Sequence, residues 1–497
     1  MKINYRAYVI PIGIALIKLL IPFIAIYPQY ELHRDEYLYL AEGRHLVWGF
    51  EEAPPLLPFL GWISYVAGNS FFTVRIWGAL LGALTALVLG AMVYRLGGKW
   101  LAQLIAGLCF LLSAYLRIHI LFQPNILDVF FWSLIAYALV CFFQTQNNRW
   151  LYVAGVALGL GILSKYMIVV FVLSIFAGIL FTRQRQLLKN KHLWLSMLLA
   201  LVIALPNIIW QFTHGIPAIH HVEELQKTQL KFISPFKFLI QQLLLTANSF
   251  PVWIAGLLVF ALHPDYRSFR VFVWAYITML IIFTLTGGKD YYTLGFYPLL
   301  FAAGSIWFER VTLHRWWPAI LLLVLVIGLE IYSLPIDLPF MAPRRAAEFY
   351  SKHHFEKFGV LEWEDGKNHA LPQDYADMLG WKEMTEKTVA FYNGLSDTLK
   401  KSTAIYCYNY GEAGALLFFT KGKDLPEPLS RSSSFELWFP KKIPASSLIV
   451  ISDDGAPESS ERYRMEDVRL IDSVSNPLAR EFGTKIYFVG SLKYLGK

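Results

Sequence analysis

The sequence predicts a polytopic α-helical membrane protein that ends in a soluble α/β domain. Two observations support this fold class. Hydrophobic residues make up 56% of the 497 residues and charged residues only 16%, which is far from the composition of an ordinary soluble protein. Apolar runs of roughly bilayer-spanning length recur through residues 1–334, whereas residues 335–497 carry charges, Ser and Pro instead. We therefore expect a transmembrane module over 1–334 and one extracytoplasmic domain over 335–497.

The apolar runs define the expected spans. The first run is about as long as a bilayer span and no small-residue cleavage site follows it, so we expect it to remain as the first helix rather than to be removed as a signal peptide. An additional half-span at 56–67 extends the expectation to about 11–13 transmembrane helices. The main runs are 8–27, 71–94, 101–116, 124–143, 151–163, 166–182, 193–212, 238–262, 271–286, 293–308 and 316–334.

The loops that carry Lys and Arg predict the orientation. Short basic loops occur at 94–100, 182–192, 263–270 and 309–315, and the positive-inside rule makes these loops cytoplasmic. The same count places the first loop, about 28–70, and the C-terminal domain on the opposite face of the cell membrane. The formal net charge of +8 is then explained by the cytoplasmic loops, and we expect no nucleic-acid partner.

The C-terminal part has the pattern of a small α/β domain. Candidate strands at 402–410, 446–454 and 485–492 alternate with a helical pattern at 381–395. It contains no glycine-rich phosphate loop, no Cys/His metal spacing and no repeat. These observations favour a recognition or packing domain over a second catalytic site.

The first loop concentrates carboxylates in a basic protein. Its start reads HRDEYLYLAEG (33–43), directly after the first apolar run. If residues 31–47 form a helix at the interface, Asp35 and Glu36 point in different directions, so that one carboxylate faces a cavity and the other supports it or binds a metal. The alternative is a hydrated loop that is acidic without a catalytic role.

Further ionisable residues are expected near the same face. Charges at membrane depth cost about 2.5–3.5 kcal/mol at a helix centre, so they need partners or a function. Singly, each could serve a structural ion pair, with Lys165 and Asp128 as an obvious pair. Together they favour an active site at the outer membrane boundary. The residues are Arg75, Asp128, Lys165, Lys289, Tyr291 and Tyr292.

The order and spacing of several motifs resemble a known family. After the Asp-Glu pair come a Pro-Pro step and further short motifs that reach into the C-terminal part. This series is similar to the bacterial glycosyltransferase family 39 (PMT/ArnT-like) of the GT-C superfamily, which is related to protein O-mannosyltransferases and lipid A aminoarabinose transferases. The motifs are APPLLPFL (53–60), TVRIWGALLGAL (73–84), QPNILDVFFW (123–132), GLGILSKYM (159–167), KDYYTLGFYPLL (289–300), YNYGEAGAL (408–416) and LPEPLSRSSSFELWFP (425–440).

The resemblance implies a GT-C fold and an inverting glycosyltransferase. Its donor would be a polyprenyl-phosphate-linked sugar, and its acceptor a lipid, glycan or protein on the external face. Asp35 is the position that matches the family's general base, and Glu36 would support it or contact sugar hydroxyls. Cations and hydroxyls would stabilise the phosphate that leaves. The donor-phosphate and substrate-binding candidates are Arg75, Asp128, Lys165, Lys289, Tyr291 and Tyr292, of which the Tyr pair fits the family pattern best.

One motif departs from the aminoarabinose-transferase pattern. Those members carry a Glu-Lys-Pro-Pro step whose Lys can contact the lipid phosphate, whereas this sequence has Glu52-Ala53-Pro54-Pro55. The phosphate must then be bound by other residues. Glu52 with His220 or His221 is a candidate divalent metal site, and the alternative is that these histidines are ordinary loop residues.

Two non-catalytic alternatives stay open at this point. A polytopic transporter or lipid-linked sugar flippase would also carry intramembrane charges. However, the sequence shows no pair of interrupted helices in matching halves and no internal repeat. A membrane scaffold that displays the C-terminal domain is the second alternative.

Overall fold

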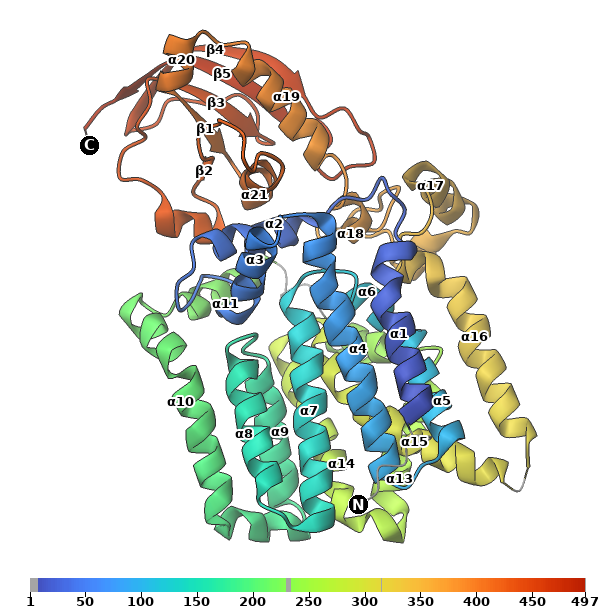
Figure 1. Cartoon of the computed structure of the whole chain (residues 1–497). Helices are drawn as coiled ribbons and strands as arrows, with labels where there is room; N and C mark the ends of the chain where they lie inside the picture. The colour runs from blue at the N-terminus through green and yellow to red at the C-terminus, as the bar shows by residue number, and fades with distance from the viewer. Residues whose placement is uncertain (1–7, 229–233, 314, 497) are drawn as a thin grey trace. The chain divides into compact units, whose positions relative to one another are not determined.

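The computed structural model describes residues 8–228, 234–313 and 315–496, and the chain divides into two compact units (Figure 1). Unit 1 comprises residues 1–25, 53–57 and 75–338, and unit 2 comprises residues 26–52, 58–74 and 339–497. The division therefore differs from a single cut at residue 334. Most of the first loop groups with the C-terminal part, because its residues pack on that part.

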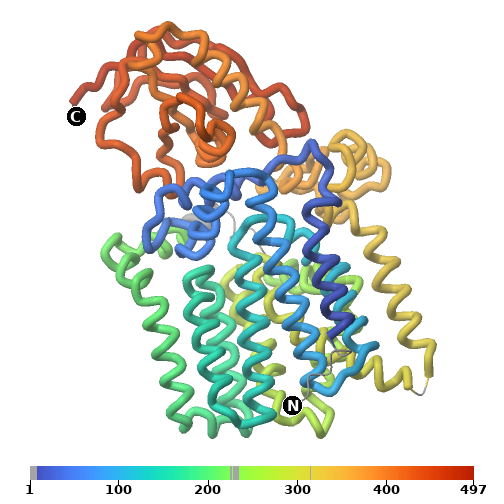
Figure 2. Tube along the Cα trace, viewed as in Figure 1, coloured from blue at the N-terminus to red at the C-terminus, as the bar shows by residue number. Residues whose placement is uncertain are grey.

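Unit 1 is helical, and segments that are distant in sequence lie side by side in it, such as α5 against α15 (Figure 2). The helices are α1 (Val9–Ile24), α4 (Phe71–Arg95), α5 (Trp100–Leu111), α6 (Tyr115–Ile118), α7 (Pro124–Thr145), α8 (Arg149–Ile162), α9 (Ile168–Leu180), η2 (Arg183–Lys189), α10 (Lys191–Thr213), α11 (Pro217–Thr228), α12 (Pro235–Leu244), α13 (Phe250–Leu262), η4 (Pro264–Phe269), α14 (Arg270–Thr286), η5 (Asp290–Phe296), α15 (Tyr297–Thr312) and α16 (Trp317–Asp337).

Several of these helices are long and apolar enough to cross a membrane, so the chain is a multi-pass membrane protein. Within the described residues five helices qualify singly, and the bent pair α9 and η2 makes a sixth. Shorter apolar helices follow other predicted runs, including 9–24, 149–162 and 250–262. The predicted total of 11–13 spans stays a prediction.

The predicted span at 238–262 is two helices instead of one. Helix α12 ends at Leu244 and α13 begins at Phe250. Pro251 lies in the first turn of α13, where its missing N–H costs nothing, whereas in the middle of one continuous helix it would remove a hydrogen bond. Hydropathy alone did not reveal this break.

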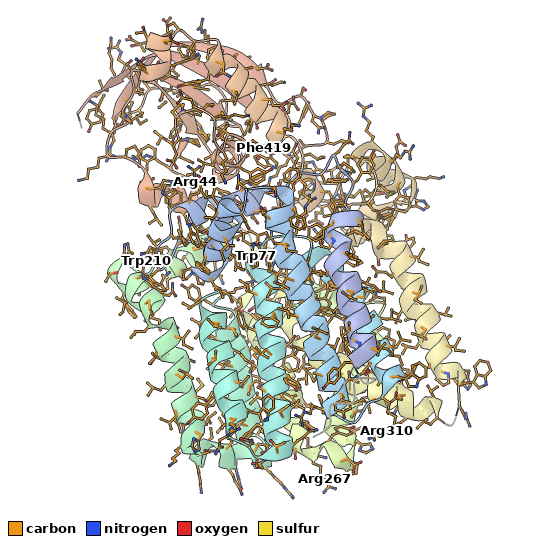
Figure 3. All side chains as sticks on the ribbon, viewed as in Figure 1. Arg44, Trp77, Trp210, Arg267, Arg310 and Phe419 are labelled. Atoms are coloured by element: carbon orange, nitrogen blue, oxygen red, sulfur yellow. The ribbon has the colours of Figure 1, made fainter. Side chains whose placement is uncertain are left out.

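The two ends of the unit 1 helices carry different side chains. Figure 3 shows Arg267 and Arg310 at one end of these helices, and Trp77 and Trp210 toward the other end. Arg267 and Arg310 belong to two of the basic loops that the sequence places in the cytoplasm. Both loops thus lie at the same end of unit 1, as a common orientation requires.

Glycines allow the closest helix crossing in unit 1. A Cβ on Gly256 of α13 would collide with the Leu300 carbonyl, and one on Gly304 of α15 would collide with the Val252 carbonyl. Helices in a membrane pack through close contacts of this kind, because the lipid is as apolar as the side chains and no hydrophobic effect drives the helices together.

Unit 2 contains a mixed five-stranded sheet in the order β2-β1-β3-β5-β4. Strand β1 is parallel to β2 and β3, and β5 is antiparallel to β3 and β4. The three predicted strands correspond to β1, β3 and β5, and the predicted helix to α19. Strand β4 was not predicted. The elements are α2 (Arg34–Arg44), α3 (Leu56–Val66), α17 (Pro343–Lys352), η6 (Phe355–Phe358), α18 (Gln373–Ala376), α19 (Trp381–Asn393), α20 (Asp397–Ser402), β1 (Thr403–Cys407), α21 (Tyr410–Phe419), β2 (Leu429–Ser430), η7 (Ser433–Trp438), β3 (Ser447–Ser452), β4 (Tyr463–Ser473) and β5 (Lys485–Tyr494).

Helix α2 is buried inside unit 2 by its contact with α21. Tyr37 is fully buried, and its ring meets the rings of Trp381 and Phe418 edge-on. Gly414 of α21 lies against the Tyr37 backbone. The helix predicted over 31–47 is therefore shorter, since α2 spans only Arg34–Arg44. Tyr39 is buried by protein and does not lie in the membrane interface.

Replacing Gly414 by Val is expected to destabilise unit 2. A Cβ at this position would lie 2.7 Å from the Tyr37 carbonyl oxygen, so α2 and α21 must move apart. Overpacking of this kind costs about 1–3 kcal/mol. A thermal melt of the purified protein measures the effect, with Gly328→Val as the control because a Cβ on Gly328 meets nothing within 4 Å. Equal melting temperatures for both variants would contradict the packing described.

Candidate active site

The start of helix α2 positions the Asp-Glu pair. His33 is the N-cap residue, and its backbone N–H donates to Glu36 Oε2 at 2.5 Å. The Glu36 side chain is buried, and it closes a capping box with His33. Glu36 thus has a structural partner that holds the first turn of the helix in place.

Asp35 is the accessible carboxylate of this turn. Its side chain is 34% exposed, whereas that of Asp377 nearby is 2% exposed. Tyr410, the first residue of α21, donates its hydroxyl to Asp35 Oδ1 at 2.8 Å. The packing of α2 on α21 therefore orients one carboxylate oxygen and leaves the group open to solvent on another side.

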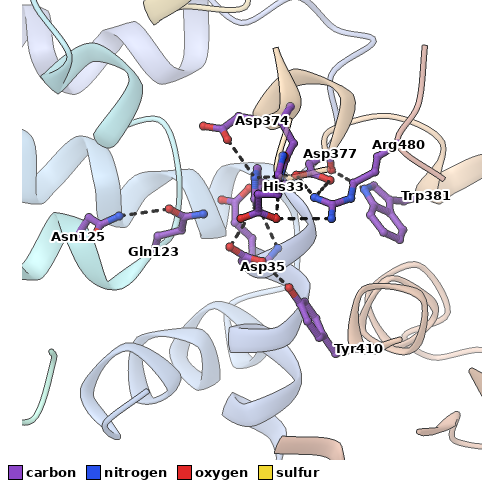
Figure 4. A network of polar contacts seen from close by, with 12 residues as sticks. His33, Asp35, Gln123, Asn125, Asp374, Asp377, Trp381, Tyr410 and Arg480 are labelled. Carbon is purple, nitrogen blue, oxygen red and sulfur yellow. Dashed lines mark hydrogen bonds and ion pairs between the residues drawn. The ribbon is translucent and has the colours of Figure 1, made fainter. Parts of the chain in front are cut away.

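The carboxylates of Asp374 and Asp377 lie beside the imidazole of His33 (Figure 4). His33 Nε2 lies 3.5 Å from Asp377 Oδ2 and 3.9 Å from Asp374 Oδ1, and Nδ1 lies 3.8 Å from Asp35 Oδ2. Arg480 Nη1 lies 3.2 Å from Asp377 Oδ2. The cluster alternates carboxylates with cations, so the buried charges are compensated.

The charge state of His33 is set by these neighbours. Burial would lower its pKa, but Asp374, Asp35 and Asp377 outweigh burial and raise the pKa to about 9. The Asp35 N–H lies 3.2 Å from Nδ1 and can donate to it only in the neutral ring, so protonation of His33 gives up this cap contact. Because three carboxylates face the ring, we take the imidazolium as the form at neutral pH.

The stability of unit 2 is expected to fall as pH rises toward 9. An ordinary unfolded His has a pKa near 6.5, so the stabilisation by His33 is complete below about pH 6.5 and is lost as pH rises through about 9. Melting temperatures measured between pH 6 and 10 should fall in this window for the wild type, and less steeply for His33→Gln. Parallel curves for the two proteins would show that His33 is not the group responsible.

Glu52 lies near Asp35 within unit 2. Burial is the main cause that raises the pKa of Glu52 to about 7, and the charges of Asp35 and Glu51 add to the effect. The candidate metal ligands Glu52 and His221 belong to different units. Across residues 8–228, 234–313 and 315–496 there is no group of three or more His, Cys, Asp or Glu side chains that could hold a metal ion. The proposed metal site therefore gains no support.

Unit 1 holds the candidate phosphate-binding cations. The Lys165 ammonium lies 5.2 Å from the Tyr291 ring centroid and 4.8 Å from that of Tyr292. It donates to Asn125 Oδ1 at 2.5 Å. The motifs around 123–132, 159–167 and 289–300, which are distant in sequence, thus meet at one cation.

The predicted ion pair of Lys165 with Asp128 is wrong as a direct contact. Asp128 is buried and accepts a hydrogen bond from Trp132 Nε1 at 2.8 Å, while Lys165 donates to Asn125 instead. The two charges attract at longer range. Trp132 lies one helical turn after Asp128 on α7, so its indole N–H is close enough to donate to the Asp128 carboxylate.

The remaining candidates occupy helix starts in unit 1. Arg75 lies in the first turns of α4, and Lys289 is the N-cap residue of η5, directly before Asp290 and Tyr291. Both are half-buried.

Sequence reasoning missed most of the groups around Asp35. Asp374, Asp377 and Arg480 come from the C-terminal part, which was taken as a packing or recognition domain. Tyr410 lies in the motif YNYGEAGAL, but the motif by itself does not indicate that this tyrosine contacts Asp35. No local signal linked these positions to residue 35, since more than 300 residues separate them.

Comparisons with known proteins agree with this architecture. Residues 52–210 match the model of the dolichyl-phosphate-mannose-protein mannosyltransferase family. The fold also resembles ArnT from Cupriavidus metallidurans bound to undecaprenyl phosphate, with a TM-score of 0.64 at 13% identity over 98% of each chain. The chain therefore has the fold of ArnT, and about a third of it is similar to this mannosyltransferase family.

Two further proteins match different shares of the chain. The lipid A galacturonosyltransferase RgtD of Rhizobium johnstonii is 24% identical over 196 residues, which are 38% of this chain and 41% of that protein. The chain thus matches less than half the length of this curated relative. The apo oligosaccharyltransferase of Archaeoglobus fulgidus matches with a TM-score of 0.53 and 12% identity, over 90% of this chain and 69% of that chain. The predicted GT-C fold is confirmed.

Proposed function

We propose that this GT-C protein is an inverting glycosyltransferase that moves a sugar from a polyprenyl-phosphate-linked donor to a hydroxyl of an acceptor. The observation that carries the proposal is the accessible Asp35 carboxylate, which is held by Tyr410 at 2.8 Å beside His33. A carboxylate in this setting can accept the proton of an attacking hydroxyl. The match to the dolichyl-phosphate-mannose-protein mannosyltransferase family and the similarity to a lipid A galacturonosyltransferase support the assignment.

The proposed reaction needs a base and a set of cations. The acceptor oxygen attacks the anomeric carbon as its proton passes to Asp35, and the bond from that carbon to the phosphate oxygen breaks on the opposite face. The polyprenyl phosphate leaves as an anion. Lys165 with Tyr291 and Tyr292 is the best candidate to stabilise this charge, with Arg75 and Lys289 as further cations.

We propose different roles for the two adjacent carboxylates, Asp35 and Glu36. Asp35 is proposed as the base because it is exposed and oriented. Glu36 is proposed as a positioning residue, because its carboxylate caps α2 through the His33 N–H. Asp128 is proposed to supply a negative charge that attracts Lys165 at longer range, without a direct contact.

The reaction is proposed to take place on the external face of the cell membrane. Basic residues such as Arg267 and Arg310 lie at one end of unit 1, which the positive-inside rule makes cytoplasmic (Figure 3). Under this orientation the first loop and the C-terminal residues are extracytoplasmic. The acceptor is then a lipid, glycan or protein of the cell envelope, and lipid A is one candidate because RgtD is a lipid A galacturonosyltransferase.

A transfer assay with purified protein tests the proposal. Undecaprenyl phosphates that carry different sugars are incubated with the protein and with membrane lipids or envelope glycans, and products are identified by mass spectrometry. We expect a new glycosylated acceptor and free undecaprenyl phosphate with the wild type. Movement of the lipid-linked sugar across a vesicle bilayer without any glycosylated product would favour the flippase alternative instead.

A further inference from the structure

A polar cavity lies in unit 2, beside the residues that hold Asp35. Its volume is about 390 Å³. Residues from the start of α2, the segment after β3 and the segment before β5 line it. The side chains that matter for its chemistry are Arg34, Asp453, Arg480, Glu481, Phe482 and Lys485.

Arg34 gives this cavity a cation with unused hydrogen-bonding capacity. Its guanidinium stacks on the Tyr410 ring, 4.7 Å from the ring centroid, and its Cγ lies against Gly411. Among the described residues it forms no ion pair within 4 Å, and its buried Nε has no hydrogen-bond partner. A buried charged donor without a partner is costly, so a ligand that supplies an oxyanion would offset that cost.

The other charges of the cavity are of both signs. Arg480 forms ion pairs with Asp377 at 3.2 Å and with Glu364 at 3.7 Å. Lys485 is exposed, and its ammonium forms no hydrogen bond or ion pair with the described part of the chain. Burial raises the pKa of Glu481, and the charge of Arg34 opposes that shift. Asp453 stays exposed and can accept hydrogen bonds from hydroxyl groups.

Phe482 adds an apolar surface to this charged site. Its side chain is 59% exposed in the turn between β4 and β5, where Gly483 has a φ of +87°. An exposed aromatic ring beside cations and a carboxylate matches a ligand that has one apolar face and a polar edge. A sugar ring with an oxyanion substituent has both features.

We propose that this cavity binds an anionic saccharide, with its phosphate or carboxylate at Arg34 and Lys485, its hydroxyls at Asp453 and its ring on Phe482. Resting on the proposed function, it is the subsite for the acceptor. Arg34 stacks on Tyr410, and the hydroxyl of Tyr410 holds Asp35. A saccharide at Arg34 is therefore next to the carboxylate that takes the acceptor's proton.

Binding of small saccharides to the full-length protein tests this subsite. Isothermal titration in detergent compares glucose 6-phosphate, glucuronate, glucose and inorganic phosphate. We expect the two charged sugars to bind at least tenfold more tightly than glucose or inorganic phosphate. Glucose 6-phosphate ahead of glucuronate identifies a phosphate as the recognised group, and the reverse order identifies a carboxylate.

Variants at the rim locate the binding. Lys485→Ala and Phe482→Ala are each expected to weaken binding of the preferred sugar about tenfold, which corresponds to one charge-assisted hydrogen bond or one aromatic contact. Lys493→Ala, on the same strand, and Phe358→Ala, at a residue that is 64% exposed, serve as matched controls. Unchanged binding in both rim variants, or equal binding of inorganic phosphate and the charged sugars, overturns the proposal.

Asp35→Asn separates this inference from the proposed function. The variant should lose sugar transfer while it keeps saccharide binding. A wild-type protein that transfers no sugar from any donor would refute the proposed function, even if charged sugars bind at the cavity. Transfer that is normal in both rim variants, with an unchanged KM for the acceptor, would refute the acceptor subsite alone.

Discussion

Replacing Asp35 by Asn is expected to lower the rate of sugar transfer by about 10² to 10⁴ while the protein stays folded. Asn has the same shape and can still accept the hydrogen bond from Tyr410, which is 2.8 Å long in the wild type. It cannot take the proton of the attacking hydroxyl. Initial rates with a saturating donor, measured next to a thermal melt, distinguish this chemical loss from unfolding.

Glu36→Gln is the matched control for that variant. Gln keeps an oxygen that can accept the His33 N–H, so the capping box is retained and activity should change only a few-fold. If Glu36→Gln is as inactive as Asp35→Asn, the proposed division between base and positioning residue is wrong. If Asp35→Asn remains fully active, the proposed mechanism fails.

Replacing Lys165 by Met is expected to lower kcat/KM for the donor by about 10² to 10³. Met fills a similar space beside Tyr291 and Tyr292 but removes the positive charge that lies near both rings. The leaving phosphate would then lose one of its proposed cations. Rates measured over a range of donor concentrations give the change.

Two lysine variants decide whether the charge at this position is what matters. Lys165→Arg keeps the charge and should recover at least part of the activity. Lys99→Met removes an exposed lysine just before α5 and should have no effect. Activity lost equally in Lys165→Met and Lys165→Arg would indicate a packing role instead.

Local patterns were sufficient for the elements of the fold. Apolar runs predicted helices such as α4, α7, α10 and α14 to within a few residues, because a membrane helix must satisfy its own backbone and present apolar side chains all around. Strands β1, β3 and β5 were also found. Strand β4 was missed because it lies at the edge of the sheet and carries charged side chains on much of its surface.

The break between α12 and α13 and the grouping of the first loop were not visible in hydropathy. The first depends on one proline in an apolar run. The second depends on Gly414, which lets α21 pack directly on the backbone of Tyr37. Neither leaves a periodic signal in the sequence.

The amino-acid sequence by itself determined the membrane character, the helical elements and the choice of Asp35, since these depend on composition, on runs of neighbouring residues and on a family pattern of motifs. Only the tertiary structure decided what surrounds Asp35. Tyr410 contacts Asp35, and Asp374 and Asp377 contact the neighbouring His33, although more than 300 positions separate the partners. Such contacts are set by the packing of α2 on α21, which no local pattern encodes.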